Sequence, residues 1–285
     1  GVNRNKRSMG LDLSKPDGQA VLLKLLEKAD VVIENFKPGT MENWGLGYED
    51  VLKGKFPRLI HCRVSGFGSD GPWGGHPGYD AIIQAMAGWF SINGEAGSNP
   101  TRLGLAMVDM GTGLYSAVAI LMAIAEREKS QQGQYLDMTL YDCAVSLMHP
   151  HIPNYLYSGE VPVATGNAHP NISPYDTFRT KTVDIFVGAG NNRAFAKMCV
   201  ELGSQELITD ARFANNIDRV TNRDDLKAEI ESSLMKIDGS EIADRLANAG
   251  LAAGAIHDTA QVVDHAHTKH REMVIEDGWY KMTGT

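Results

Sequence analysis

Apolar positions in the first part of the chain change repeatedly between the period of helices and that of strands. Leucines and a valine recur at helical spacing over residues 20–28, and the β-branched run at 30–35 predicts a buried parallel strand. Residues 59–65 predict a second such strand, and the loop that follows at 66–78 holds six glycines and two prolines. This alternation predicts an α/β fold, in which ligands bind beyond the carboxyl ends of the parallel strands.

Longer periodic segments follow the glycine-rich loop. Residues 79–90 and 110–127 predict two apolar, buried helices, residues 135–140 predict a strand, and residues 142–157 predict a further helix. Ser14 is a candidate N-cap for the first helix of the chain. The first half of the sequence therefore supplies both the strands and the covering helices of one sheet.

Composition changes near the middle of the chain. Gly, Pro, Asn and small residues concentrate at 158–174, which predicts a domain boundary. We expect a large α/β domain over residues 1–160 and a smaller α+β domain over residues 161–285. Within the smaller domain, residues 177–178 and 184–187 predict a hairpin, and amphipathic helices dominate the remainder.

The charge balance limits the partners that the protein can have. The 27 Lys and Arg residues are outnumbered by 35 Asp and Glu, and the net charge of -8 argues against nucleic acid, whose phosphates need clustered cations. The apolar runs are too short to span a bilayer, and no secretory signal opens the chain. Three separated cysteines predict neither disulfides nor a Cys-rich metal site, so we expect the cytoplasm or an organelle matrix.

One carboxylate lies where chemistry is expected. Asp109 stands between an apolar run and the helix predicted at 110–127. As an N-cap it would accept hydrogen bonds from the first amide groups of that helix. As a nucleophile it would be accessible, because Gly111 and Gly113 have no side chains to cover it, and the helix N-terminus would keep it ionised. From these residues alone the cap is the favoured interpretation, and the same interpretation applies to Asp80 at the start of the preceding helix.

Three further segments have both a functional and an ordinary interpretation. In the turn at 34–39, Asn35 and Phe36 suit an adenine or pantetheine group, although Phe36 packed inward would make an ordinary turn. The opening segment 3–8 carries three positive charges in four residues, which suits phosphates or a solvated loop. The glycine loop at 187–192 suits a carboxylate or forms a plain strand-to-helix turn.

Taken together, these segments resemble the family III CoA-transferases, the group that includes formyl-CoA:oxalate CoA-transferase and the carnitine CoA-transferases. The resemblance reverses the interpretation of Asp109, because it identifies this residue with the covalent carrier of the family. The matching segments follow the family's order and spacing over nearly the whole chain, at residues 3–8, 11–13, 29–39, 78–80, 104–113 and 187–191.

The resemblance implies a mechanism and a set of contacts. Asp109 would attack the thioester carbonyl of an acyl-CoA, and the CoA thiolate would then form an aspartyl-CoA thioester that an acceptor carboxylate attacks. Backbone N–H groups of Gly188, Ala189 and Gly190 would stabilise the developing charge. Coenzyme A is a cosubstrate in this scheme, with no metal and no permanently bound cofactor, and we expect a dicarboxylic acceptor. The CoA site would be lined by Leu11, Ser14, Asn35, Phe36, Lys37, Tyr79 and Asp80.

The chain departs from the family at specific positions. Family members often carry lysine where Ser14 stands and arginine where Asn43 stands, so Lys15 and Lys37 are candidates to replace those phosphate contacts. The related acyl-CoA racemases carry a histidine where this chain has Tyr79, and without it the acid/base pair for α-proton exchange is incomplete. This difference favours a transferase over a racemase, and a non-catalytic acyl-CoA-binding protein is the third hypothesis.

The resemblance also implies an assembly. The family fold has a Rossmann-like large domain with a parallel sheet and a smaller α+β domain, in two ring-like subunits threaded through each other as a homodimer. Family proteins have a further N-terminal segment and a C-terminal segment that returns to the large domain. Because the chain starts at Gly1 without methionine and stops at Gly284-Thr285 in a predicted strand or turn, we expect a fragment that is poorly soluble or inactive by itself.

Overall fold

The chain folds into two compact units. The structure is a computed structural model that describes residue 3, residues 5–278 and residues 280–283. One unit comprises Ser8–Ala164, and the other combines the residues before Ser8 with those from Thr165 onward. The predicted strand or turn at Gly284-Thr285 lies outside the described residues, as does Arg4 of the basic opening segment.

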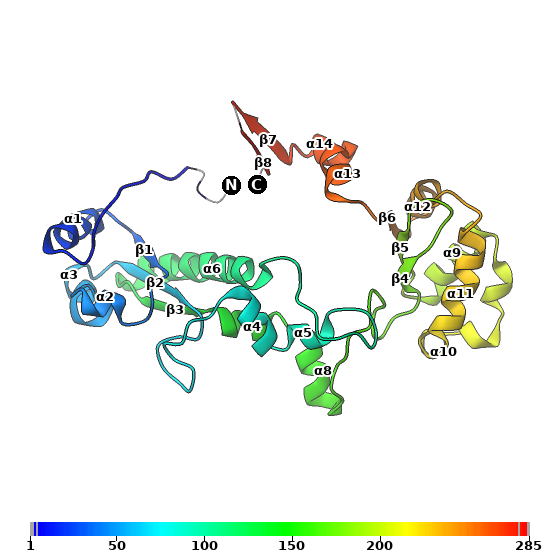
Figure 1. The fold of residues 1–285 in the computed structure, drawn as a ribbon, viewed down its shortest axis with the longest axis horizontal. Helices are drawn as coiled ribbons and strands as arrows, with labels where there is room; N and C mark the ends of the chain where they lie inside the picture. The colour runs from blue at the N-terminus through cyan, green and yellow to red at the C-terminus, as the bar shows by residue number, and fades with distance from the viewer. Residues whose placement is uncertain (1–2, 4, 279, 284–285) are drawn as a thin grey trace. The chain divides into compact units, whose positions relative to one another are not determined.

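The first unit is built on a three-stranded parallel sheet. Strands β1 (Val31–Glu34), β2 (Ile60–Ser65) and β3 (Tyr135–Thr139) lie in that order, and each neighbouring pair is parallel. The long helix α6 (Met107–Ser130) lies against β2 and β3 (Figure 1). The predicted α/β architecture with a parallel sheet is therefore confirmed.

Shorter helices complete this unit. The first begins with Pro16, which suits a first helical position, but its N-cap is Lys15 and not Ser14, so the predicted cap is wrong. The short helical segments are α1 (Pro16–Leu26), α2 (Thr40–Asn43), the π-helix η1 (Tyr48–Leu52), α3 (Lys53–Lys55), α4 (Asp80–Met86), α5 (Trp89–Ile92), α7 (Leu140–Ser146) and α8 (His151–Ser158).

Two helices predicted as continuous are each interrupted. The segment at 79–90 forms α4 and α5 because Gly88 between them has a φ of 89°, a left-handed conformation that ends a helix. The segment at 142–157 forms α7 and α8, which are separated by residues that include Pro150. Proline has no N–H to continue the hydrogen bonds of α7, so a new helix starts after it.

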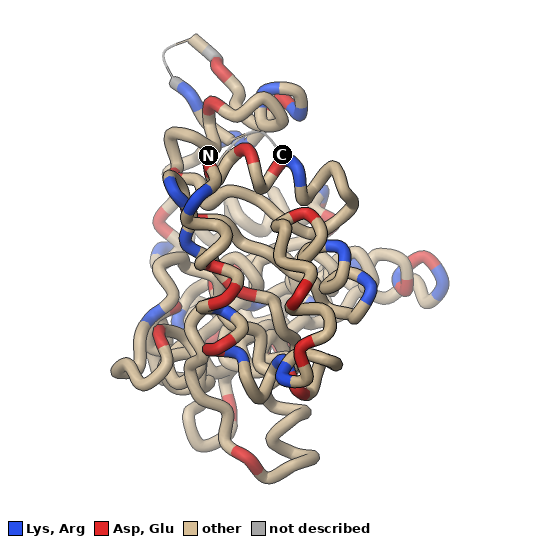
Figure 2. The backbone as a smooth tube through the Cα atoms, turned by 90° about the vertical axis from the view of Figure 1, so that its right-hand side faces the viewer, with Lys and Arg blue, Asp and Glu red and all other residues tan. Residues whose placement is uncertain are grey.

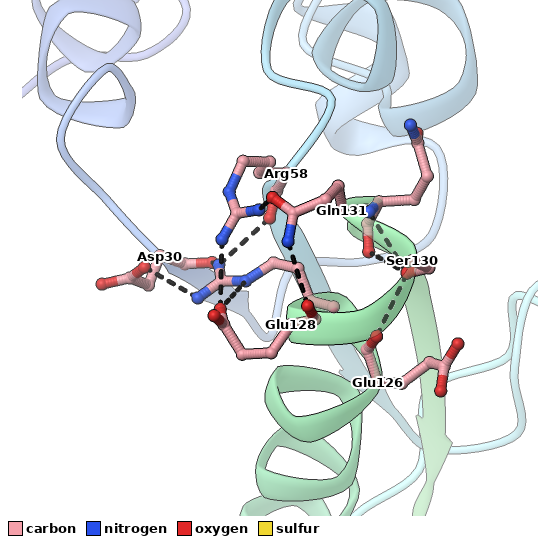
Figure 3. A network of polar contacts seen from close by, with 8 residues as sticks. Asp30, Arg58, Glu126, Glu128, Ser130 and Gln131 are labelled. Carbon is pink, nitrogen blue, oxygen red and sulfur yellow. Dashed lines mark hydrogen bonds and ion pairs between the residues drawn. The ribbon is translucent and has the colours of Figure 1, made fainter.

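Polar contacts fix the end of α6 to the amino ends of two strands. The buried Arg127 donates from Nη1 to the carbonyls of Asp30 and Arg58, at 3.2 and 3.1 Å, and from Nη2 to the Asp30 carboxylate at 2.9 Å. Arg58 bonds in turn to Glu128 and Gln131 (Figure 3). Since the last turn of α6 is held at the amino ends of β1 and β2, its first turn lies toward their carboxyl ends.

By length and composition alone, α6 is long and apolar enough to cross a membrane, so the prediction that the apolar runs are too short is wrong for this helix. Within the unit it contacts β2, β3, α4 and α7. Lys and Arg are interspersed with Asp and Glu along the chain (Figure 2).

The second unit has an antiparallel sheet with helices packed against it. The predicted hairpin is confirmed as β4 (Tyr175–Phe178) and β5 (Ile185–Gly188), and β6 (Ala252–Ala255) pairs with β5. Helices α11 (Arg223–Leu234) and α12 (Gly239–Asn248) contact these strands (Figure 1). The core includes Phe213, Met198, Ile230 and Leu246, all fully buried. The remaining elements are α9 (Asn192–Leu202), the 3-10 helices η2 (Gln205–Ile208) and η3 (Ala211–Phe213), α10 (Asn216–Thr221), α13 (Thr259–Asp264), α14 (Ala266–His270), β7 (Val274–Asp277) and β8 (Tyr280–Thr283).

Candidate active site

Asp109 lies in the first turn of α6 with an exposed side chain. The helix starts at Met107, its N-cap is Ala106, and Ala106 makes no side-chain cap hydrogen bond. Asp109 is the third residue of the helix, so the interpretation of this residue as the N-cap is wrong. Its carboxylate does not cap the helix and is exposed at the helix start.

The cap of α6 comes instead from another helix. Asp80, the first residue of α4, is 8% exposed, and its Oδ2 accepts hydrogen bonds from the N–H groups of Val108 at 2.9 Å and of Asp109 at 3.2 Å. These two N–H groups have no partner within α6, because they belong to its first turn. Asp80 therefore fixes the backbone that carries Asp109. Its own carboxylate is buried.

Gln84 completes this arrangement and was missed by the sequence analysis. It is fully buried, and its Nε2 donates to Asp80 Oδ1 at 2.6 Å and to the carbonyl of Leu105 at 3.1 Å. Its Oε1 accepts from the N–H of Leu103 at 3.1 Å. A buried amide one helical turn after Asp80 in an otherwise apolar helix was the available signal. Gln84 thus ties the loop before α6 to α4.

The two glycines after Asp109 have different surroundings. A Cβ at Gly111 would lie 2.7 Å from Leu147 Cδ1, so this buried glycine lets α6 approach the end of α7. A Cβ at Gly113 would meet nothing within 4 Å. The prediction that both glycines leave the carboxylate unshielded therefore holds only at Gly113, where the space beside the helix is open.

The environment of Asp109 makes its carboxyl a weaker acid than expected. Partial burial raises the pKa of Asp109, and the negative charge of Asp80 raises it further. Asp80, and not the Asp109 carboxylate, accepts the N–H groups of Val108 and Asp109 at this helix start. A less stabilised carboxylate is a stronger nucleophile in its anionic form, at the cost of being protonated at a higher pH.

The turn after β1 presents the second group of predicted site residues. Asn35 Nδ2 donates to the carbonyl of Val64 in β2 at 2.6 Å, and the N–H of Phe36 donates to Glu34 Oε2 at 2.7 Å. The ring of Phe36 is 40% exposed and contacts Trp44 edge to face, with the ring centres 5.2 Å apart. Phe36 is therefore not packed inward, and an aromatic pair is open to a flat ligand beside the end of β2.

The segment before α1 presents Leu11 and Ser14. Ser14 donates from its hydroxyl to Asp12 Oδ1 at 2.6 Å and from its N–H at 3.0 Å, and these bonds hold the pKa of Asp12 below its ordinary value. A Cβ at Gly18 would lie 1.9 Å from the carbonyl oxygen of Asp12. The absence of a side chain at Gly18 thus lets this turn lie directly on α1, with Leu11 half-buried and Ser14 exposed.

The Asp80–Asp109 pair and the turn after β1 meet around the carboxyl end of β2. The backbones of Gly66, directly after β2, and Gly78 approach so closely that a Cβ on Gly66 would lie 2.7 Å from Gly78 Cα. This contact puts Asp80, and through it Asp109, next to the same strand end that Asn35 contacts. The structure therefore brings the aspartate and the Asn35–Lys37 turn to the edge where α/β folds bind ligands.

A cavity of about 460 Å³ at the same edge has a different character. It is lined by residues after β1 and β2, including Gly39 and Ser69, and by Arg63. Arg63 is buried and bonded to both Glu34 and Glu42. Burial acts to raise the pKa of Glu42, but the bond and charge of Arg63 together with a backbone bond hold it below its ordinary value. Because Arg63 is neutralised in this way, the cavity suits the phosphates of CoA poorly.

The predicted glycine loop lies in the second unit. Gly188 ends β5, Ala189 is buried and Gly190 is exposed. The N–H of Ala189 donates to the carbonyl of Pro174 at 2.8 Å, so it is already bonded and the prediction of three oxyanion donors is wrong for this residue. Asn191 then caps α9, with its side chain accepting from the N–H of Ala194.

Comparisons with known proteins identify the family of the chain. The profile of CoA-transferase family III matches residues 1–284 of the chain. An acyl-CoA transferase of Fusarium pseudograminearum is 40% identical over 96% of this chain and 60% of its own length. The acetyl-CoA:oxalate CoA-transferase of Acetobacter aceti is 35% identical over 99% and 73%, and the succinate–glutarate CoA-transferase of Agrobacterium fabrum is 36% identical over 97% and 70%.

Solved structures show the same fold. A CaiB/BaiF family protein from Brucella suis matches with a TM-score of 0.82 and 40% identity, over 95% of this chain and 71% of its own. Rv3272 from Mycobacterium tuberculosis matches with a TM-score of 0.89 and 31% identity, over 99% and 76%. The chain spans 60% of the Fusarium relative and 73% of the Acetobacter relative.

Proposed function

The chain belongs to CoA-transferase family III, and on that premise we propose that it moves CoA from an acyl-CoA thioester to a carboxylic acid, with Asp109 as the covalent carrier. The observation that carries this proposal is an exposed carboxylate in the first turn of α6 whose backbone is held by the buried Asp80. Such a group is accessible yet fixed, as a nucleophile needs to be.

The exchange proceeds through four balanced steps. An oxygen of Asp109 attacks the thioester carbonyl carbon, the carbon–sulfur bond breaks, and CoA leaves as the thiolate from a mixed anhydride. The thiolate attacks the aspartyl carbonyl and releases the donor acid, which leaves an aspartyl-CoA thioester. The acceptor carboxylate attacks this thioester and again releases the thiolate. The thiolate then attacks the acceptor's acyl carbon, which forms the new acyl-CoA and restores the Asp109 carboxylate.

Coenzyme A is the shared substrate of these steps. The exposed Phe36 beside Trp44 suits the adenine or the pantetheine arm, and Asn35 is fixed by its bond to β2. Lys37 and Lys15 are the cations that would replace the family's phosphate contacts at Ser14 and Asn43. Tyr79, which is 77% exposed beside Asp80, is the residue we assign to the reacting end of the site.

The acceptor in this proposal is a dicarboxylic acid. Two of the relatives are named for oxalate and for succinate and glutarate, all of which carry two carboxyl groups. The Gly188–Gly190 loop is the segment that the family resemblance assigns to the transferred acyl group, with Gly190 exposed at its end. We also propose a Rossmann-like large domain, an intertwined homodimer and residence in the cytoplasm or an organelle matrix.

The proposal is tested by Asp109→Asn, which keeps the size of the side chain and removes the nucleophile. We expect transfer from succinyl-CoA to a panel of dicarboxylates to fall at least a thousandfold, and hydroxylamine to label residue 109 only in the unmodified protein incubated with acyl-CoA. Mass spectrometry of the digested protein measures the label.

Asp142→Asn is the matched control, because Asp142 is also an exposed aspartate in the first turn of a helix in this unit. It should retain full transfer. Unchanged turnover in Asp109→Asn would defeat the covalent mechanism. Deuterium uptake from solvent at the α-carbon, without any acceptor acid, would indicate a racemase instead.

A further inference from the structure

Arg219 is a buried cation that the proposed function does not use. It is fully buried in the second unit, and its guanidinium lies over the ring of Phe195 at 4.6 Å. Among the described residues no carboxylate is bonded to it, and burial holds its pKa below the ordinary value for arginine. Burying a charge without an opposite charge is costly, so its hydrogen bonds must compensate.

Those bonds join three separate segments. Arg219 Nε donates to the carbonyl of Ser173 at 2.8 Å, Nη1 donates to the carbonyl of Phe213 at 3.0 Å, and Nη2 donates to Asn192 Oδ1 at 3.0 Å. Ser173 precedes β4, and Asn192 is the first residue of α9. The fork of one guanidinium thus holds the segment before β4 and the segment after β5 at fixed positions.

Two neighbouring side chains hold the same segment before β4. Asn216 Nδ2 donates to the carbonyl of Asn171 at 2.9 Å, and Asn216 Oδ1 accepts from the N–H of Ser173 at 3.2 Å. Arg223 donates to the carbonyls of His169 and Pro170 at 3.3 and 3.2 Å. Side chains at or near α10 and α11 therefore clamp the segment 169–173 through its backbone rather than through its side chains.

The clamped segment lies against the glycine loop. The carbonyl of Pro174 accepts from the N–H of Ala189 at 2.8 Å, and a Cβ at Gly190 would lie 3.3 Å from Ile172 Cγ2. On the other side, Asn192 follows the loop after a single residue. Arg219 is thus bonded next to both flanks of the Gly188–Gly190 loop, although it contacts neither glycine.

We propose that Arg219 is a positioning residue that sets the conformation of the Gly188–Gly190 loop for transfer. This inference rests on the proposed function, in which that loop acts on the transferred acyl group. Lysine would keep the positive charge but is a point donor without the planar fork, so it cannot hold Ser173 and Asn192 together. The loop would then be misplaced while the CoA contacts of the first unit stay intact.

The test compares Arg219→Lys with Arg212→Lys in steady-state transfer. Arg212 is an exposed arginine of the same unit that also lies over a phenylalanine ring, at 4.7 Å, but has no bond to the loop or to segment 169–173. We expect Arg219→Lys to lower kcat at least tenfold with the KM for acyl-CoA changed less than twofold, and Arg212→Lys to change neither. Far-UV circular dichroism and thermal unfolding establish that each variant is folded.

Asn192→Ala is the second variant. It removes the bond between Arg219 and the exposed first residue of α9. It should lower kcat about threefold to tenfold with KM unchanged, and it decides the matter if Arg219→Lys does not fold. A folded Arg219→Lys or Asn192→Ala with normal kcat would overturn the positioning role. Loss of transfer in Asp109→Asn alongside that result would leave the proposed function standing, so the two failures are distinguishable.

Discussion

At the scale of single residues, the acidity of Asp109 depends on its partial burial and on a second aspartate. Asp80 caps α6 with one oxygen and is held by Gln84 at the other, so its negative charge stays close to Asp109. Asp80 makes the capping hydrogen bonds that the sequence had offered to Asp109, which leaves Asp109 for the proposed nucleophilic role. Partial burial raises the pKa of the Asp109 carboxyl, and the charge of Asp80 raises it further.

This raised pKa predicts a particular acid limb for activity. Asp109 must be anionic to attack, so turnover falls as the pH drops through its raised pKa, at a higher pH than for a carboxyl in water. Asp80→Asn removes the repulsion and should move that limb to lower pH. The pH profile of kcat/KM measures the shift, with Asp142→Asn as the control. A limb that stays in place or moves to higher pH would contradict the assignment.

At the scale of elements, the sheet and its loops were predictable because the spacing of apolar residues and the glycine content are local properties of the sequence. The hairpin of β4 and β5 was predicted for the same reason, whereas β6 was missed because its sequence Ala252-Ala253-Gly254-Ala255 has no strand-like pattern of large residues. The cap of α6 could not be predicted either. It depends on Asp80 lying beside a helix that starts 27 residues later, which is a tertiary contact.

One glycine carries a testable consequence for the proposed CoA site. Gly18→Ala would put a Cβ 1.9 Å from the carbonyl of Asp12, so the backbone that carries Leu11 and Ser14 must move off α1. We expect a loss of about 1–3 kcal/mol in the free energy of unfolding, as for overpacked sites. The KM for acyl-CoA should rise several-fold, while kcat changes little.

Gly54→Ala is the control for this prediction. Gly54 is an exposed helical glycine with nothing within 4 Å of the added Cβ, so alanine should be neutral or slightly stabilising. Urea unfolding and steady-state kinetics of both variants give the comparison. An unchanged KM in a folded but destabilised Gly18→Ala would remove the segment before α1 from the CoA site.

At the scale of the whole molecule, one face of α6 is unusually apolar for its exposure. Leu114, Leu121 and Met122 are between 66% and 69% exposed in the single chain, and all three follow Asp109 on the same helix. Large apolar side chains gathered in this way mark an interface. They support the proposed homodimer, which would bring a second copy close to the helix that carries Asp109.

The dimer predicts how this face responds to a charge. In a monomer, Leu121→Glu replaces an exposed leucine and should change the free energy of unfolding by no more than about 0.5 kcal/mol. In a dimer that covers α6, the same change buries an unpaired carboxylate and should abolish assembly and activity together. Light scattering should give twice the chain mass for the unmodified protein, with no dependence on dilution because threaded rings cannot separate while folded. Lys129→Glu, at an exposed polar position of α6, should leave that mass unchanged. A single-chain mass, together with a Leu121→Glu variant of normal stability and activity, would exclude the dimer.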